Sequence, residues 1–439
     1  MSAIHAVGRS ALLAVAVATT CSVAGAQTTP KQVVKPPVSQ AWIDVATYSG
    51  FGMGAGMGGP GGGGMMGATL GAMMGGGKSA PKAEFGYTQS GPAGRWMDVT
   101  LHTSRNPSLQ EALQAVPSGT QLAPTLKLVS PEPAKTKPAP TSDEESAPLD
   151  YEPPKGKFVL YWGCSETVRP GQPKILDLQS ATMAEFGTFF ESRRATQRGT
   201  PLAPGRPVWP NKVDSRALPA GASLVGQHAF TGQGVPESFR FDVAASQDIM
   251  PEIKLRQTDR GNHILLEWNA LPTARAYFLG SMGSREGGEM TMVVWTSSEL
   301  PDSGFGLFDY QTNAAVDRWL KDKVLLPPAT TKCAVPKEAA GQGMLRAIAY
   351  GTELNMAYPP RPTDPKIPWE PDWNVKIRVK SMTTSMFGMP DMSEMGGAGG
   401  DEEMSDAPPP SEAAPSTEEP KKKKKGFNPL DVLKDVVVK

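Results

Sequence analysis

Four methionines near the end of the chain have the residue type and the spacing for soft-metal chemistry. Met386, Met389, Met392 and Met395 recur at every third position. Thioether sulfur is a soft ligand that suits Cu(I), so one hypothesis is a copper-handling segment in an exported protein. The alternative is an adaptable apolar contact, because methionine is frequent throughout the chain, with 21 residues in all. No histidine lies near the segment to complete a mixed copper site.

Motifs of known catalytic classes do not occur in the sequence. Three of the four histidines, His102, His228 and His263, follow the N-terminal apolar segment, and they lie far apart. The chain has no G-x-S-x-G, H-E-x-x-H or clustered Cys/His motif, so no catalytic residue and no cofactor are assigned. A triad can still assemble from distant residues. An exported hydrolase with a dispersed active site is therefore the second functional hypothesis.

A glycine-rich stretch resembles a phosphate-binding loop in part of its sequence. Residues 75–79 read Gly-Gly-Gly-Lys-Ser, but the motif needs glycine where Ala72 stands, and Pro81 interrupts the helix that should follow. The surrounding residues 45–77 carry no charge and have a glycine at every fourth position, at Gly63, Gly67, Gly71 and Gly75. This spacing suits close helix packing in a membrane. A disordered glycine-rich loop is the alternative that composition favours.

Cys164 and Cys333 are the two cysteines that remain beyond the N-terminal apolar segment. An even number of cysteines in an exported protein predicts a disulfide between them. The alternative is a pair of buried thiols. Their wide separation excludes a C-x-x-C redox or zinc motif.

The first 26 residues have the order of features of a cleaved secretory signal peptide. Arg9 precedes an uncharged apolar run at residues 11–17, and residues 24–26 read Ala-Gly-Ala. Small residues at these positions are what a signal peptidase reads, so cleavage is predicted between Ala26 and Gln27. The apolar run is far shorter than the ~20 residues that span a bilayer. The mature chain is therefore expected in the periplasm or outside the cell.

Composition limits the function classes and divides the chain. The 47 glycines and 43 prolines are gathered in patches, which indicates long linkers or disorder. The net charge of zero excludes a general basic surface for nucleic acid. The predicted layout is a signal peptide at 1–26, a small α+β region at 41–130 with a Gly/Met-rich insertion at 50–77, a Pro-rich linker at 131–156, a β-rich sandwich domain with inserted helices at 157–385, a disordered tail at 386–426 and a short helix at 427–439.

The ordered regions show both strand and helix patterns. Residues 41–47 and 95–103 share a W-[IM]-D-V core and are predicted to be paired or equivalent strands of one small sheet. Helices are predicted over residues 108–115, 181–194 and 313–323. In residues 375–380, Val375, Ile377 and Val379 alternate with Lys376, Arg378 and Lys380. This alternation predicts a strand with one buried and one solvated face.

One segment carries a resemblance to a known family. Residues 264–279, ILLEWNALPTARAYFL, place Trp268, Pro272, Ala274 and Tyr277 as in the strand–turn–strand that opens fibronectin type III domains. The segment resembles that family, and compatible strands continue to residue 350. The resemblance implies an immunoglobulin-like β-sandwich, mainly β in class, in which Trp268 fills the core. It implies no activity, because these are packing residues.

The end of the chain has the features of a docking segment. Five lysines, Lys421 to Lys425, precede Asn428 and Pro429, which are a good N-cap and a good first residue for a helix. Residues Lys421–Lys439 are therefore expected to contact an envelope protein or an anionic membrane surface. Thr20 stands where lipoproteins have a small residue before Cys21, which argues against a lipid anchor. The leading functional hypothesis is an exported cell-envelope protein with a non-catalytic binding or scaffolding role.

Overall fold

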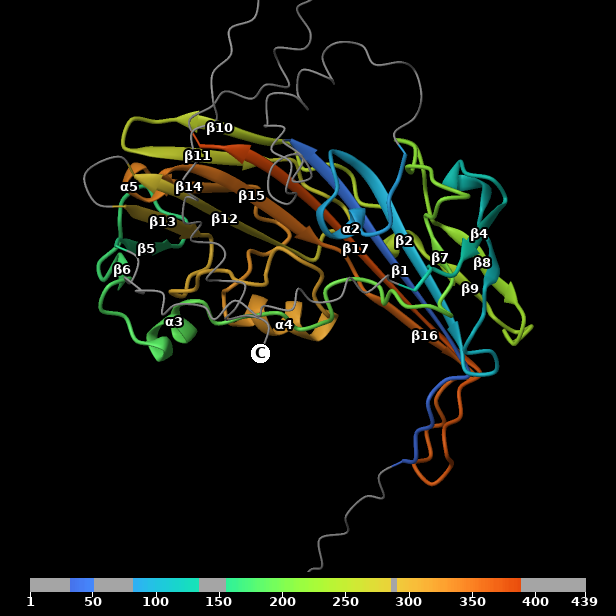
Figure 1. The fold of residues 1–439 in the computed structure, drawn as a ribbon. Coiled ribbons are helices and arrows are strands. Elements are labelled where there is room, and N and C mark those ends of the chain that lie inside the picture. Colours follow the sequence, from blue (N-terminus) through green and yellow to red (C-terminus); the bar gives the residue numbers. More distant parts are fainter. Residues whose placement is uncertain (1–31, 51–81, 134–154, 286–289, 388–439) are drawn as a thin grey trace, which may run out of the picture.

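The computed structural model describes residues 32–50, 82–133, 155–285 and 290–387, and their strands form two β-sheets. The larger sheet is open and mixes parallel and antiparallel pairs (Figure 1). Its spatial order is β6 (Lys174–Asp177), β5 (Lys157–Trp162), β13 (Thr291–Thr296), β12 (Ala276–Arg285), β15 (Gln342–Tyr350), β17 (Trp373–Met386), β1 (Ser39–Gly50), β2 (Gly94–Thr103), β7 (Val208–Trp209), β4 (Thr125–Val129), β3 (Glu111–Ala115), β8 (Gly226–Gly232) and β9 (Arg240–Val243).

Shorter elements complete the fold. Strand β16 (Leu354–Tyr358) pairs with β17 off the main path. A second sheet contains β10 (Leu255–Asp259), β11 (His263–Trp268) and β14 (Lys332–Pro336). The described α-helices are α2 (Tyr87–Ser90), α3 (Met183–Phe189), α4 (Asn313–Lys321) and α5 (Lys337–Ala340).

The centre of the large sheet is formed by β1 with its two neighbours. Strand β1 pairs with β17 in parallel and with β2 in antiparallel orientation, along nearly its whole length. Because side chains alternate between the faces of a strand, Ile43, Val99 and Val379 enter one hydrophobic core. The even-numbered side chains of these strands lie on the opposite face.

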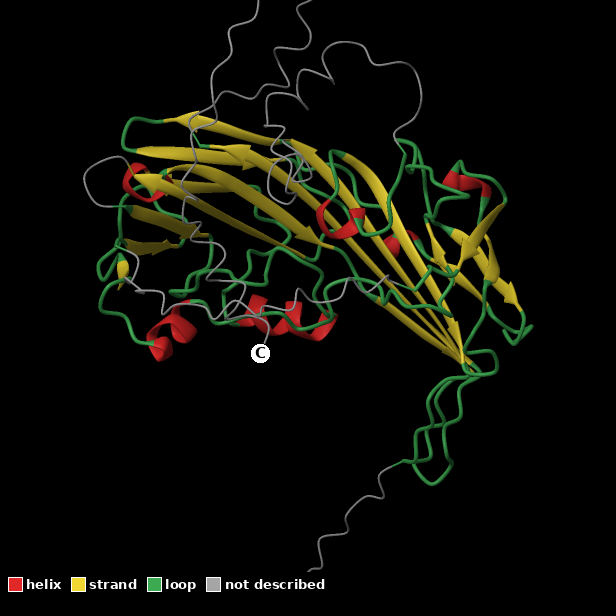
Figure 2. Ribbon diagram, in the orientation of Figure 1, coloured by secondary structure: helices red, strands yellow, loops and turns green. Residues whose placement is uncertain are grey.

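The opposite face of the sheet is covered by helices and irregular chain. Val316 and Trp319 of α4 pack against Phe278, Ile348 and Met382 of the sheet. Further along, Phe189 of α3 packs against β5 and β6. Figure 2 shows α3 and α4, in red, together on one side of the strands. The large sheet is therefore buried on both faces at its centre.

Several predicted elements are confirmed and one is wrong. The strands over 41–47 and 95–103 are present as β1 and β2 and pair directly, but they lie at the centre of the large sheet and not in a small one. The predicted helices at 181–194 and 313–323 correspond to the shorter α3 and α4. The helix predicted over 108–115 is a strand instead, β3. Ala112 and Gln114 are buried while their neighbours are exposed, because β3 pairs with β4 and β8. Its alternating burial follows from sheet partners that lie elsewhere in the sequence.

The predicted mainly-β class is confirmed, whereas a sandwich is not. The ring of Trp268 is buried and contacts Tyr277 edge to face at 5.6 Å, so both residues fill the core. They belong to different sheets, β11 to the small one and β12 to the large open one. The predicted domain division remains a prediction, and strands from both sides of the 131–156 segment lie in the large sheet.

Several predictions fall on residues outside the described ranges. These are the signal peptide with its Ala26–Gln27 cleavage, nearly all of the Gly/Met-rich insertion, most of the 131–156 linker, and the tail from residue 388 onward with its helix at 427–439. Within the described ranges, no helix is long and apolar enough to cross a membrane.

Candidate functional site

A row of charged side chains crosses the centre of the large sheet. The register places Asp44 of β1 directly beside Asp98 of β2 on one side and Arg378 of β17 on the other. Lys380 follows Arg378 on the same face, two residues along the strand. None of these four side chains is more than 1% exposed. The structure therefore brings two carboxylates and two basic groups together in a water-poor environment.

The burial of this row overturns one sequence-based prediction. The basic side chains of residues 376–380 were expected on a solvated face, but Arg378 and Lys380 are buried. Backbone and side chains of residues 195–198 and 309–311 cover them. Lys376, nearer the start of the strand, keeps partial exposure and pairs with Glu353 at 3.2 Å. Charge alternation alone did not reveal that a distant segment covers the face.

Asp44 and Arg378 form a two-pronged ion pair. Nε of Arg378 donates to Oδ1 of Asp44 at 2.6 Å, and Nη2 donates to Oδ2. The indole of Trp42 also donates to Asp44, at 3.1 Å, and the third guanidinium nitrogen donates to the backbone oxygen of Gln197 at 2.7 Å. Such paired hydrogen bonds are the strongest geometry for arginine and carboxylate. Burial raises the pKa of Asp44, and the charge of Arg378 opposes that rise.

Aromatic rings surround the basic groups. The guanidinium of Arg378 lies 4.8 Å from the ring centre of Trp42 and 4.4 Å from that of Tyr310. The Lys380 ammonium lies 4.2 Å from the same Tyr310 ring and 3.3 Å from an oxygen of Asp309. Burial lowers the pKa of Lys380, and the charge of Asp309 opposes this. Cation–π contact and ion pairing together replace the lost hydration of both cations.

Asp98 ends the row and is held by a short turn. Its carboxylate accepts from the N–H of Gly86 at 3.1 Å, from the N–H of Thr88 at 3.3 Å and from the Thr88 hydroxyl. Gly86 has a φ of 101°, a left-handed conformation that favours glycine. Burial raises the pKa of Asp98 to about 7, and the charge of Asp44 contributes in the same direction. Asp98 therefore gains or loses a proton near neutral pH.

The titration of Asp98 predicts a pH-dependent stability. Its pKa rises from 3.8 to about 7 on folding, so between these values the folded chain holds a proton that the unfolded chain has released. The free energy of unfolding should therefore fall as the pH rises through this window, by up to about 4 kcal/mol. Denaturant unfolding at pH 4.5–8 measures this slope.

The Asp98→Asn variant is the matched control for this measurement, because it keeps the shape but does not titrate. Burial lowers the pKa of His228, which adds a slope of opposite sign below the ordinary histidine pKa, and this slope is common to both proteins. The difference between the wild-type and Asp98→Asn curves therefore isolates Asp98. Two parallel curves would contradict the assignment.

Access to the charged row is restricted. A narrow crevice beside it is lined by Tyr310, Gln311, Tyr350, Gly351, Glu353, Arg378 and Val379. It encloses about 200 Å³, including open solvent at its mouth, and does not admit a water-sized sphere. The row combines carboxylates with basic side chains, and the pKa values of Asp98 and Lys380 are shifted. Acid–base catalytic sites have both features. The row can hold a proton and fix three strands, and within the described residues the crevice beside it leaves no space for a substrate.

The histidines that were candidates for a hydrolase lie apart from this row. His228 is buried, stacks on Phe241 at 5.4 Å and hydrogen-bonds to the backbone oxygen of Leu224 at 2.8 Å. His263 hydrogen-bonds to the exposed side chain of its neighbour Asn262. Within the described residues, neither histidine forms a hydrogen bond or ion pair with a carboxylate. Their contacts are those of a packed ring and of a surface ring.

Of the four methionines predicted to bind copper, Met386 lies in the described ranges and the other three do not. The register places Met386 opposite Met344 and Met344 opposite Met282, which forms a row of three methionines across neighbouring strands. The guanidinium of Arg346 contacts the sulfur of Met344 at 3.3 Å. This cation disfavours a second positive charge there. Among the described residues, no group of three or more His, Cys, Asp or Glu has the arrangement of a metal site.

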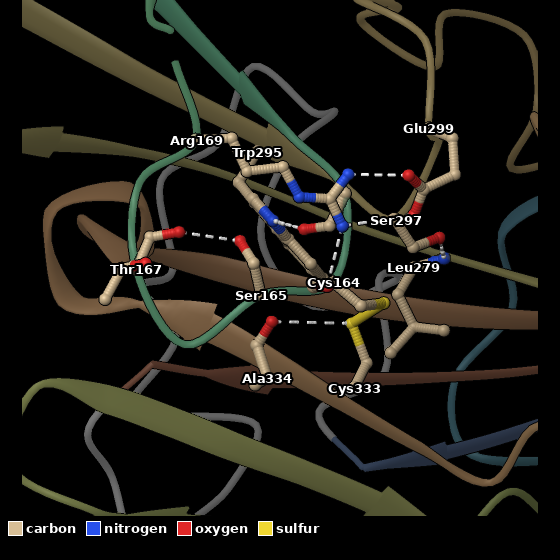
Figure 3. The surroundings of a disulfide bond; sticks show 11 residues. Cys164, Ser165, Thr167, Arg169, Leu279, Trp295, Ser297, Glu299, Cys333 and Ala334 are labelled. Carbon is tan, nitrogen blue, oxygen red and sulfur yellow. Dashed lines mark hydrogen bonds and ion pairs between the residues drawn. A yellow bond between two sulfur atoms is a disulfide. The ribbon is translucent and has the colours of Figure 1, made fainter.

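The two cysteines are joined in the structure. Figure 3 shows the disulfide between Cys164, just after β5, and Cys333 of β14, so it links the large sheet to the small one. Beside it, Arg169 pairs with Glu299 at 2.6 Å and donates to the backbone oxygen of Cys164 at 2.8 Å. The disulfide and these bonds fix the loop that follows β5 onto its neighbours.

The sequence carries a signal for the charged row, although the pattern does not show that the row is buried. The W-[IM]-D-V core occurs twice, so two aspartates occupy equivalent places in paired strands. Residues 376–380 supply a complementary basic alternation in the last described strand. The aspartates and the basic residues come together only because β1 pairs with β17, whose residues lie more than 300 positions away in the sequence. The interpretation of the row rests on its own geometry, since no protein-family model, curated protein or solved structure matches this chain.

Proposed function

We propose that the mature chain is exported and has a non-catalytic binding or scaffolding role in the cell envelope. The observation that carries this proposal is a projecting arm formed by residues 32–38 and 359–372 (Figure 1). The arm extends away from the end of the sheet. A projection of this kind increases the surface for binding and adds little to the core.

The arm is ordered by a few specific contacts. The N–H of Trp369 donates to the backbone oxygen of Val33 at 2.8 Å, and the N–H of Lys35 donates back to Trp369 at 2.9 Å. Arg361 lies 5.6 Å from the centre of the Trp369 ring. Despite this order, Val33, Val34 and Ile367 are 60%, 48% and 51% exposed. Exposed apolar side chains on an ordered projection are a feature of interaction surfaces.

Capture of envelope proteins tests the proposal. The arm variant Val33→Ser/Val34→Ser/Ile367→Ser should lose a partner that the wild-type chain retains from envelope extracts. The matched control Met183→Ser/Leu202→Ser/Val213→Ser removes apolar side chains that are 70%, 58% and 69% exposed elsewhere on the molecule. Capture that is the same for all three proteins would refute a role for the arm.

Export and membrane contact are tested separately. N-terminal sequencing of the protein from the host envelope should give Gln27 as the first residue, and a start at Met1 would contradict export with cleavage. Residues Lys421–Lys439 are proposed to add contact with an anionic membrane or an envelope protein. A chain that ends at residue 420 should then lose sedimentation with anionic vesicles, while neutral vesicles bind neither form.

A hydrolase is a second candidate, favoured by the perturbed pKa values of Asp98 and Lys380. Purified chain would be assayed with ester, amide and phosphate-ester substrates. Turnover that Lys380→Met abolishes without loss of folding would support this candidate. Turnover unaffected by Lys380→Met and Asp98→Asn would exclude the charged row as its site.

Copper handling is a third candidate. The row of Met282, Met344 and Met386 supplies thioether sulfurs for it, while the guanidinium of Arg346 beside Met344 opposes a bound cation there. Cu(I) titration would compare the wild-type chain with Met344→Leu and with a chain lacking residues 387–395. Equal affinity in all three would remove this candidate, because neither set of thioethers would then be a ligand.

A further inference from the structure

Strand β16 has a free edge beside the centre of the large sheet. It pairs with residues 373–377 of β17 on one side, where β15 has already ended. In Figure 1, β16 lies along the outer margin of the strands next to the arm. Within the described residues, no strand pairs with its other side.

Backbone geometry identifies the groups that point outward from this edge. The backbone oxygen of Tyr358 accepts from Asp372, so it points toward β17. Because the hydrogen-bonding direction alternates along an antiparallel strand, the N–H and C=O groups of Asn355 and Ala357 point away from β17. Among the described residues, no hydrogen bond from outside the strand ladders reaches those groups.

Glu353, the residue just before β16, shows how the same edge is hydrogen-bonded outside the strand. The side-chain amide of Asn313 donates to the backbone oxygen of Glu353 at 2.8 Å and accepts from its N–H at 2.9 Å. This single amide takes the place of a neighbouring strand at Glu353. This bonding by a side-chain amide ends at Glu353. Within the described residues, no comparable side chain bonds to the edge from Asn355 to Ala357.

The composition of β16 differs from that of the other edge strands. Natural sheets protect edges with charged side chains, proline or short length. Strand β6 carries Lys174 and Asp177, and β9 carries Arg240 and Asp242. Strand β16 reads Leu-Asn-Met-Ala-Tyr and has no charge and no proline. Of these three edge strands, β16 is therefore the one without protective charges. It is also the one that pairs directly with the central strand β17.

Apolar side chains reach this edge from the core. Leu354 and Met356 pack against the main hydrophobic core and remain partly exposed. Tyr358 is 46% exposed, and its ring stacks on Trp373 at 5.9 Å. The hydrophobic core therefore extends to β16 at the margin of the sheet, where its last side chains are partly exposed to solvent.

We propose that β16 pairs with β16 of a second copy of this chain, so that the two large sheets join into one. The two-fold axis passes beside Met356, and the strands run antiparallel. In this register Asn355 of each copy exchanges two backbone hydrogen bonds with Ala357 of the other. Leu354 then lies opposite Tyr358, an aliphatic–aromatic pair that favours antiparallel strands.

A second copy fits this edge because a two-fold contact must be complementary to itself. The strand carries no charge, so the symmetric pairing brings no like charges together. A five-residue strand buries less than a standard interface. The chain continues from Tyr358 into the arm, so in this register the arm begins beside Leu354 of the other copy. The proposal does not depend on the envelope role.

Charge placement tests both the pairing and its register. In the proposed dimer, residue 355 of one copy faces residue 357 of the other. The variant Asn355→Lys/Ala357→Lys therefore places lysine opposite lysine twice, whereas Asn355→Lys/Ala357→Glu places lysine opposite glutamate twice. Sedimentation velocity over a concentration series gives the dimer dissociation constant of each protein, with thermal unfolding as the check on folding.

The wild-type chain should sediment as a dimer at micromolar concentration. Lysine opposite lysine should raise the dissociation constant about tenfold or more, and lysine opposite glutamate should leave it near the wild-type value. The variant Ala357→Pro removes one outward N–H per copy and should also weaken the dimer. It leaves the bonds to β17 intact.

A wild-type chain that stays monomeric at all concentrations would overturn the proposal. The same conclusion follows if the lysine–lysine and lysine–glutamate variants dimerise equally well, because β16 would then lie outside the interface. An edge that is protected from hydrogen exchange in a monomer would mean that another segment or a partner peptide occupies it, which also contradicts pairing between copies.

Discussion

Replacement of Arg378 by methionine is expected to lower the free energy of unfolding by about 3–5 kcal/mol, the usual cost of removing one partner of a buried ion pair. The substitution leaves the carboxylate of Asp44, which is 0% exposed, without its two guanidinium hydrogen bonds. Methionine keeps most of the side-chain volume, so lost charge and hydrogen bonding dominate the effect. Denaturant unfolding measures it.

The pH dependence of this variant gives a second readout. Without Arg378, the pKa of Asp44 should rise further, since burial already raises it and the opposing charge is gone. The folded variant then holds a proton that its unfolded form releases. The loss in stability should therefore be larger at pH 8 than at pH 5.

Two comparisons separate the ion pair from general packing. Arg346→Met removes an arginine on the same face that forms no ion pair with any described residue, so its cost should be smaller. The double variant Asp44→Asn/Arg378→Met should lose clearly less than the sum of the two single variants, because no charge is then left unpaired. Additive losses would contradict a coupled pair.

Removal of the Cys164–Cys333 disulfide should lower stability by about 5 kcal/mol. The bond spans a sequence separation of 169 residues, and a loop of this length removes much conformational freedom from the unfolded chain. Cys333 is also 2% exposed, within the main core. The variant Cys164→Ala/Cys333→Ala, unfolded by denaturant, gives the size of the loss.

Reduction of the wild-type protein is the control for this prediction. Reductant should lower the unfolding midpoint of the wild type to near that of the alanine variant and leave the variant unchanged. The variant Glu299→Gln weakens the neighbouring pair with Arg169, which is partly exposed, and should cost less than 1 kcal/mol. A wild-type midpoint that does not respond to reductant would show that the bond does not form in solution.

The charged row connects these measurements to the architecture. Asp44 and Arg378 lie 334 positions apart and meet only when β1 and β17 pair in the observed register. A shift of one residue would turn one of the two charges to the opposite, apolar face. The ion pair therefore disfavours wrong registers in the strand pair that joins the two ends of the described chain.

Local sequence patterns determined the type of many elements. The repeated W-[IM]-D-V core predicted β1 and β2 and their pairing, and the apolar spacing of residues 313–323 predicted α4. These predictions succeed because backbone alternation and helical periodicity are properties of neighbouring residues. The short helix predicted over residues 108–115 failed because sheet partners elsewhere in the chain decided the conformation of β3.

The tertiary structure alone decided what surrounds each side chain. By itself, the sequence determined that Arg378 and Lys380 share one face of a strand and that Asp44 and Asp98 occupy matching positions. It did not determine that residues 195–198 and 309–311 cover that face, or that no strand of the described residues pairs with the edge of β16 that faces away from β17. Burial, pKa shifts and free edges depend on contacts between residues that lie far apart in the chain, and no local pattern encodes those contacts.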